Sequence, residues 1–199
     1  MRSRKIYLSL IFVLLFGFGQ AQSNEGAIWY FGDYAGASWC GSYLTTGEPE
    51  PLFDSQLQTN EGVATIADAQ CNLLFYTDGI TVWDASHVAM PNSLASSSGG
   101  ALQGDPSSTQ SGVIVPKPLD PNTFYIFAVD ANIGTYGCTY SRVDMTANFG
   151  MGDVDLAEKN VLLFTPSSEK ISAVNHANGL DIWVITHEWQ SNGFVTYLD

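Results

Sequence analysis

The chain has 199 residues, of which 45% are hydrophobic, 13% aromatic and 14% charged, and it carries twenty acidic against seven basic residues. This balance is that of a folded domain rather than a disordered segment, and a chain of this length can bury a sizeable core. The net charge of −13 repels phosphates and anionic lipids, which argues against binding to nucleic acids or membrane surfaces.

Residues 1–21 have the pattern of a secretory signal peptide. Arg2, Arg4 and Lys5 precede an apolar run from Ile6 to Phe18, and small residues lead to a predicted cleavage point after Ala21. Cleavage leaves residues 22–199 with four basic residues against twenty acidic ones, a net charge of −16. The apolar run is shorter than the roughly 20 residues that cross a bilayer. We therefore expect a secreted or outer cell-surface protein without a membrane span.

Three cysteines, Cys40, Cys71 and Cys138, lie far apart in the sequence. In an oxidising compartment at most one pair of them can bridge within the chain, which leaves one thiol over. No C-x-x-C spacing occurs, so small buried side chains are favoured over a metal or redox site.

Strand-like runs dominate the mature part. They are rich in Val, Ile, Phe, Tyr and Trp and are bounded by polar, Gly, Pro or Asn residues, and no long stretch has a helical period. Short strands separated by turn signals indicate an all-β sandwich, barrel or propeller. The runs are Ala27–Phe31, Gly62–Ile66, Leu73–Tyr76, Ile80–Trp83, Gly112–Val115, Thr123–Val129, Thr139–Val143, Asn160–Phe164, Ile171–Val174, Leu180–Thr186 and Gly193–Tyr197.

An internal repeat favours the propeller. One hairpin pattern, an apolar strand, a polar turn and an aromatic strand, occurs at Gly62–Asp78, Ser111–Asp130 and Ile171–His187, and Ala27–Asp33 looks like a further copy of its second strand. The aromatic strands recur at about 45–57 residues, near the kelch-type period. We expect a partial β-propeller of about three to four four-stranded kelch- or WD-like blades that stack face to face. The alternative is a β-sandwich, in which the hairpins pair edge to edge.

Two linking segments have distinct compositions. Ser93–Gln110 contains a Ser- and Gly-rich stretch and is interpreted as a flexible surface loop. Pro116–Pro121 holds three prolines and predicts a rigid turn within the second hairpin.

Four polar residues follow or end the aromatic strands at matching places: Asp33, Asp78, Asp130 and His187. If the strands radiate as blades, these residues gather on one rim and form a ligand-binding surface. The alternative is that each side chain caps its own turn.

Five tryptophans raise the question of sugar stacking, because an exposed indole packs well on a pyranose ring. Trp29 and Trp183 lie centrally in apolar strands and are expected in the core. Trp39 and Trp189 flank loops that contain Gly or Asn and are the ligand-binding candidates.

The sequence contains no complete catalytic template, so no catalytic residue is predicted. His176 and His187 belong to one predicted hairpin and are weak candidates for a divalent metal, against a role in packing. Asp153 and Asp155 place two carboxylates on one face of an extended segment, but the ordered calcium loop is absent. No cofactor is predicted, with calcium the one ion left open.

The assembled motifs resemble the N-terminal propeller-like region of large secreted proteins of gliding bacteria that use the type IX secretion system. The likeness spans nearly all of the mature chain and rests on the order and spacing of short motifs. These are Ile28–Asp33, Thr59–Thr65, Asn72–Trp83, Met90–Asn92, Ser107–Ser111, Val161–Leu163, His176–Gly179 and Thr186–Trp189.

The resemblance implies a location at the cell surface and a role in adhesion, without naming a ligand. We expect a non-enzymatic adhesion or binding module whose ligand is a glycan or a protein. In such proteins adhesin-like repeats and a sorting domain read by the secretion machinery follow this region. Neither occurs here, which suggests a propeller that is incomplete at its C-terminus and whose open strand edges promote self-association. The alternatives are a secreted carbohydrate-active enzyme with two carboxylates facing across the propeller axis, and a structural cap for downstream repeats.

Overall fold

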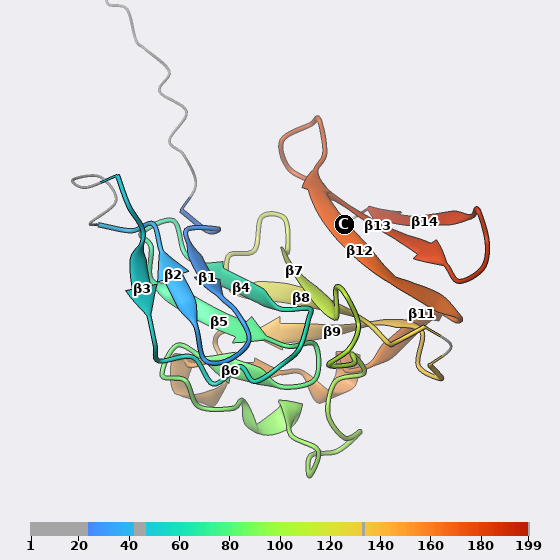
Figure 1. The fold of residues 1–199 in the computed structure, drawn as a ribbon, viewed down its shortest axis with the longest axis horizontal. Coiled ribbons are helices and arrows are strands. Elements are labelled where there is room, and N and C mark those ends of the chain that lie inside the picture. Colours follow the sequence, from blue (N-terminus) through green and yellow to red (C-terminus); the bar gives the residue numbers. More distant parts are fainter. Residues whose placement is uncertain (1–23, 42–46, 133, 199) are drawn as a thin grey trace, which may run out of the picture.

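The computed structural model describes residues 24–41, 47–132 and 134–198; the expected signal peptide lies outside them. All paired strands are antiparallel, and they form four small sheets that follow one another along the chain (Figure 1). Sheet 1 contains β1 (Ile28–Tyr30), β2 (Gly36–Ser38) and β3 (Glu50–Leu52); sheet 2 contains β4 (Ala64–Ala67), β5 (Leu73–Thr77) and β6 (Val82–Asp84). Sheet 3 contains β7 (Gly112–Pro116), β8 (Thr123–Val129), β9 (Cys138–Asp144), β10 (Asp153–Val154) and β11 (Val161–Phe164); sheet 4 contains β12 (Ser167–Asn175), β13 (Ile182–Glu188) and β14 (Phe194–Leu198).

Each of the eleven expected strand runs overlaps a strand of the structure, and the all-β class is confirmed. Three strands were missed, namely β2, β3 and β10, because they are only two or three residues long and have no recognisable apolar run; β2 also contains Gly36, and β3 contains Pro51. Three short 3₁₀ turns, η1 (Pro91–Ser93), η2 (Asn148–Gly150) and η3 (Leu156–Glu158), lie in the longer connections.

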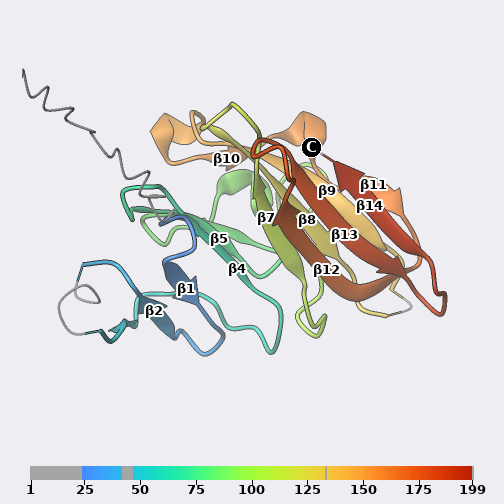
Figure 2. The ribbon, with the colours of Figure 1, turned by 90° about the horizontal axis from the view of Figure 1, so that it is seen from above.

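The three predicted hairpins are β4–β5, β7–β8 and β12–β13, and each lies in a different sheet. The sheets pack face to face, since one apolar cluster joins sheets 2 and 3 and another joins sheets 3 and 4. Figure 2 shows sheet 4 lying across sheet 3. No ladder among the described strands joins one hairpin to another, which contradicts the edge-to-edge sandwich.

Neighbouring residues of the central strands face different cores. On β5, Phe75 packs toward sheet 3, whereas Tyr76 packs toward sheet 1. On β8, Ile126 packs toward sheet 2, whereas Phe127 packs toward sheet 4. Side chains alternate between the two faces of a strand, so a strand that is apolar at every position must be covered on both sides. The aromatic strands therefore dictate a stack of sheets.

The four sheets are also stacked in the order in which they follow one another along the chain. The first strand of each sheet contacts the first strand of the next, in the succession β1, β4, β7 and β12. The stack is open, and none of the four sheets closes on itself. The expectation for Ala27–Asp33 was wrong in one respect: β1 is the first strand of its sheet and not a copy of the second, so Asp33 does not occupy the place of Asp78 and Asp130.

Sheet 1 is linked to sheet 2 by a disulfide between Cys40 and Cys71, which agrees with the expectation of at most one bridge. Cys138 is free and buried in the core between sheets 3 and 4, and burial raises the pKa of its thiol to about 12. The thiol is therefore protonated and unreactive at neutral pH.

The connection Ser93–Gln110 is more firmly held than its composition indicates. The ammonium group of Lys159 donates hydrogen bonds to Asn92 O at 2.6 Å and Ser97 Oγ at 2.7 Å, and it also contacts Gly100 O. Leu102 is buried in the core between sheets 2 and 3. Composition alone does not reveal this anchoring, because the partner lies about sixty residues further along the chain.

Within the described part of the chain, no helix has the length and apolar character needed to span a bilayer.

Candidate functional site

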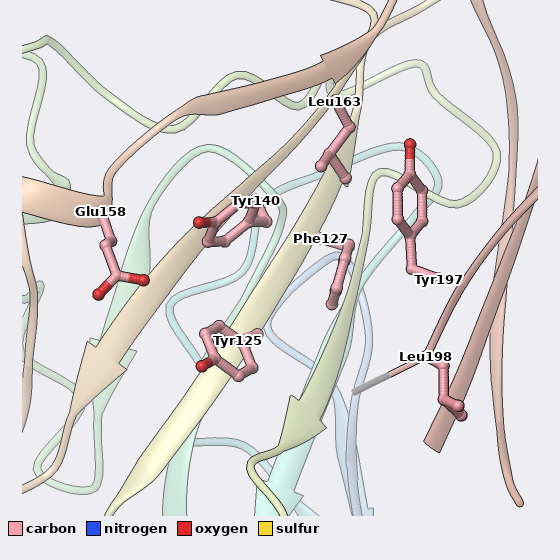
Figure 3. Close-up of a pocket in the computed structure, with 7 residues that line it drawn as sticks. All are labelled: Tyr125, Phe127, Tyr140, Glu158, Leu163, Tyr197 and Leu198. Carbon is pink, nitrogen blue, oxygen red and sulfur yellow. The ribbon is translucent and has the colours of Figure 1, made fainter. Parts of the chain in front are cut away.

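A trough of about 200 Å³ opens between the outer strands of sheets 3 and 4 (Figure 3). Four of its seven lining residues are aromatic, and one carboxylate lies at one end. The residues that line it are Tyr125, Phe127, Tyr140, Glu158, Leu163, Tyr197 and Leu198. We refer to this site as the aromatic trough.

Sheet 3 forms the floor of the trough. Tyr125 and Phe127 lie two residues apart on β8 and so share one face, and Tyr140 lies directly opposite Phe127 on β9. The Tyr140 ring centroid lies 5.9 Å from that of Tyr125, edge to face, and 6.1 Å from that of Phe127. These ring contacts hold three side chains as one rigid surface.

The trough remains open because the two sheets differ in width. Sheet 3 continues past β9 with β11, which carries Leu163, whereas sheet 4 ends at β14. Tyr197 and Leu198 on β14 form the opposite wall, and the Tyr197 ring centroid lies 6.4 Å from that of Phe127. The outer part of the sheet 3 face thus has no strand of sheet 4 above it.

The end of the trough near Glu158 is polar and negatively charged. The hydroxyl groups of Tyr125 and Tyr140 point toward it (Figure 3). Glu158 Oε1 lies 2.9 Å from Arg142 Nε, and Arg142 also forms an ion pair with Asp155. Two carboxylates share one guanidinium, so this end carries an excess negative charge. Burial raises the pKa of Tyr197, so its hydroxyl is a hydrogen-bond donor at neutral pH.

This chemistry suits the binding of an amphipathic ligand. Aromatic faces take apolar surface, the phenol hydroxyl groups can donate or accept hydrogen bonds, and the carboxylate accepts them or pairs with a cation. Glu158 is the carboxylate among the residues that line the trough.

Two of the predicted rim residues, Asp78 and Asp130, accept hydrogen bonds from backbone N–H groups close to them in the sequence. Asp78 Oδ1 accepts hydrogen bonds from the N–H groups of Ile80 and Thr81, at 2.8 and 2.7 Å. Asp130 is buried and accepts from the N–H groups of Ala131 and Tyr136, at 2.8 and 2.9 Å. Both therefore cap their own turns, which is the alternative that the sequence left open.

The other two rim residues have different surroundings. Asp33 is exposed and adopts a positive φ of 57° in the turn between β1 and β2. His187 lies near the end of β13, with its ring centroid 5.1 Å from that of Phe194 on β14.

The tryptophans differ in part from expectation. Trp29 is half exposed and not in the core, since it lies on the outer face of sheet 1, where its centroid is 4.6 Å from that of Trp39. Trp183 is partly buried against His176. Trp189 is partly buried, and its backbone N–H donates to Pro166 O at 3.2 Å. The exposed indole of this set is Trp29, which the strand pattern had assigned to the core.

The metal candidates are dispersed. His176 precedes the turn of the β12–β13 hairpin and His187 lies at the far end of β13, so the hairpin does not bring the two imidazoles together. Asp153 accepts from Asn92 N–H at 2.9 Å, and Asp155 pairs with Arg142. Among the residues that the structure describes, no group of three or more His, Cys, Asp or Glu side chains is placed to hold a metal ion.

No family model matches the chain, and no curated protein or solved structure matches it either. The site is therefore interpreted from its own geometry. Sequence reasoning missed Tyr125, Tyr140 and Tyr197. The sequence signal that could have found these tyrosines is their position in strands that are apolar on both faces. That signal does not predict the trough itself, which depends on the unequal widths of two sheets.

Proposed function

We propose that this protein is a non-enzymatic, extracellular binding or adhesion module whose ligand, a glycan or a protein, binds in the aromatic trough. The observation that carries the proposal is the trough in which the half-buried rings of Tyr125 and Tyr140 lie beside Glu158. Aromatic rings that line an open trough can pack against a ligand, and aromatic residues are enriched at recognition sites.

The architecture supports assigning this module to a propeller-like region of a type IX-secreted surface protein. Four sheets follow the chain order, they stack face to face, and their first strands contact one another in succession, as the inner strands of blades do. The sequence resemblance described above points to the same class.

An extracellular location is supported by two features. The Cys40–Cys71 disulfide is compatible with an oxidising compartment, and twenty acidic against seven basic residues favour solubility outside the cell.

The direct test is a binding screen of the mature protein against glycan and matrix-protein arrays, repeated with Tyr140→Ala. Loss of the central ring is expected to weaken binding at least about tenfold. Phe149→Ala is the matched control, because Phe149 is fully exposed on a separate loop. Trp189→Ala tests the tryptophan alternative. Binding that falls only in Trp189→Ala would relocate the site, and no binding to either array would refute the proposal.

A further inference from the structure

A groove of about 480 Å³ lies between sheets 2 and 3, where the β4–β5 and β7–β8 hairpins turn. It is formed by Glu25 together with residues from the segments 67–74 and 116–124, and we refer to it as the turn groove. Its volume is in the range of ligand sites in proteins. The turn groove shares no residue with the aromatic trough, and it lies between two sheets that are each packed against a further sheet on the other side.

The floor of the turn groove is apolar. Ala67 and Phe124 are buried, and Leu74 packs against the core between sheets 2 and 3. At the outer edge of the groove, Leu119 is 87% exposed and has a positive φ of 62°. Asn or Gly adopts such a φ more readily, so the backbone of this turn does not require leucine. The apolar surface thus continues from the groove onto the outside of the protein.

The rim of the turn groove is acidic. The carboxylates of Glu25, Asp68 and Asp120 are accompanied by one ammonium group, that of Lys117, whose Nζ lies 3.8 Å from Asp120 Oδ2. Glu25 is held at the rim because its C=O accepts a hydrogen bond from Ala67 N–H at 3.0 Å. Side-chain hydrogen bonds lower the pKa of both Asp68 and Asp120, so both carboxyl groups are ionised at neutral pH. The rim therefore has an excess of negative charge that a cation can complement.

We propose that the turn groove binds a basic segment of a partner protein, in which an arginine or lysine side chain lies next to an apolar one. The apolar side chain packs on Leu74 and Leu119, and the cation pairs with the carboxylates of the rim. A polypeptide is favoured over a free amine, because the exposed side chain of Leu119 extends the contact surface beyond the groove. This site is additional to the aromatic trough of the proposed function.

The ligand side is tested with a blocked pentapeptide, Gly-Leu-Arg-Leu-Gly, titrated into the nitrogen-15-labelled mature protein and followed by amide chemical shifts. A second peptide carries citrulline in place of arginine, which keeps the shape and removes the charge, and acetyl-arginine amide represents a free cation. We expect the shifts to be confined to the two turns, and both control ligands to bind at least tenfold more weakly. Absence of shifts at millimolar pentapeptide, shifts elsewhere, or equal binding of either control ligand would overturn the inference.

A matched pair of variants tests the protein side. Glu25→Gln removes one rim charge, and Glu50→Gln makes the same change in net charge on exposed β3, outside the groove. We expect Glu25→Gln to weaken binding of the pentapeptide about two- to fivefold and Glu50→Gln to leave it unchanged. Equal weakening in both variants would mean that the overall charge of the protein attracts the peptide, and the groove would be excluded as the site.

The apolar contact and the position of the site have their own variants. Leu119→Asn keeps the positive φ and removes the apolar side chain, and we expect it to weaken binding at least fivefold without a change in circular dichroism. Tyr140→Ala alters the aromatic trough and should leave binding of the pentapeptide unchanged. Binding that depends on Tyr140 and not on Leu119 would place the peptide in the trough and overturn the inference.

Discussion

At the scale of single residues, a partly buried chain of polar side chains joins sheets 1 and 2. Tyr30 Oη donates to Asp54 Oδ1 at 2.9 Å, and the other oxygen of Asp54 lies 3.3 Å from His87 Nε2. Tyr76 Oη lies 3.2 Å from His87 Nδ1 and accepts from Gln56 N–H at 3.0 Å. The Asp54 carboxylate accepts, so Nε2 carries a proton toward it, and Nδ1 of a neutral imidazole then accepts the hydroxyl proton of Tyr76.

Tyr76→Phe should therefore destabilise the fold. The substitution leaves Gln56 N–H and His87 Nδ1 without their partner next to a fully buried ring, which costs about 1–2 kcal/mol. Urea denaturation followed by fluorescence measures the loss. Tyr140→Phe is the control, because its hydroxyl group faces the open trough, and its effect should stay within about 0.5 kcal/mol. Equal losses in the two variants would mean that the polar chain contributes nothing.

The same hydroxyl groups predict a loss of stability in alkali. Burial raises the pKa of Tyr76 to about 12, and burial together with the hydrogen bond to Asp54 also raises the pKa of Tyr30. Unfolded tyrosine has a pKa near 10. Below pH 10 both states are protonated and the stability is complete. Between pH 10 and 12 only the unfolded state loses the protons, so stability falls as the pH rises.

Melting temperatures between pH 8 and 11 check this dependence, with absorbance near 295 nm reporting phenolate. We expect the melting temperature to decrease above pH 10, and less steeply in Tyr76→Phe. A constant melting temperature to pH 11 would show that these hydroxyl groups ionise as readily in the folded protein as in the unfolded chain.

At the scale of elements, the disulfide ties the end of β2 to the turn between β4 and β5. Cys40 and Cys71 are 31 residues apart, and reduction frees a loop of that length in the unfolded chain. We expect reduction to cost about 3 kcal/mol. Denaturation with and without reductant measures this, and a Cys40→Ala/Cys71→Ala double variant serves as the control because reductant should not affect it. A fully reduced parent protein of unchanged stability would contradict the expectation.

The elements also show what a sequence can and cannot reveal. The β8 run Thr123–Val129 was predicted with the bounds that the structure has, because its apolar residues are continuous. Two strands of sheet 1, Gly36–Ser38 and Glu50–Leu52, were harder to predict from the sequence. They are strands because they pair with neighbouring strands, and their own residues do not indicate it. The trough was not foreseen, because Tyr140 and Tyr197 are 57 residues apart and meet only through sheet stacking. The loop anchored by Lys159 was missed for the same reason.

At the scale of the whole molecule, the stack has an exposed apolar surface at its outer end. On the face of sheet 4 that points away from sheet 3, Val174 and Phe194 are at least half exposed, and Ile185 is exposed to a smaller degree. Inside the stack such faces are covered by a neighbouring sheet. An uncovered face of this kind favours association between molecules.

We therefore expect the isolated chain to self-associate, and more strongly at high salt, because salt screens the repulsion between acidic molecules. Sedimentation velocity over a range of concentrations, at low and at high salt, measures this. Phe194→Ser removes the most exposed ring of that face and should shift the protein toward monomer. A parent protein that stays monomeric at high salt and high concentration would show that the face is tolerated in water.

The central claim is that sheets 2, 3 and 4 stack face to face, because the trough exists only if sheet 4 covers part of sheet 3. Nuclear Overhauser contacts between ring protons test it directly. The account predicts contacts of Phe75 with Phe124 and of Phe127 with Tyr197, whose ring centroids lie 5.4 and 6.4 Å apart. Backbone contacts that pair β5 with β7, or β8 with β12, as neighbouring strands of one sheet would contradict it.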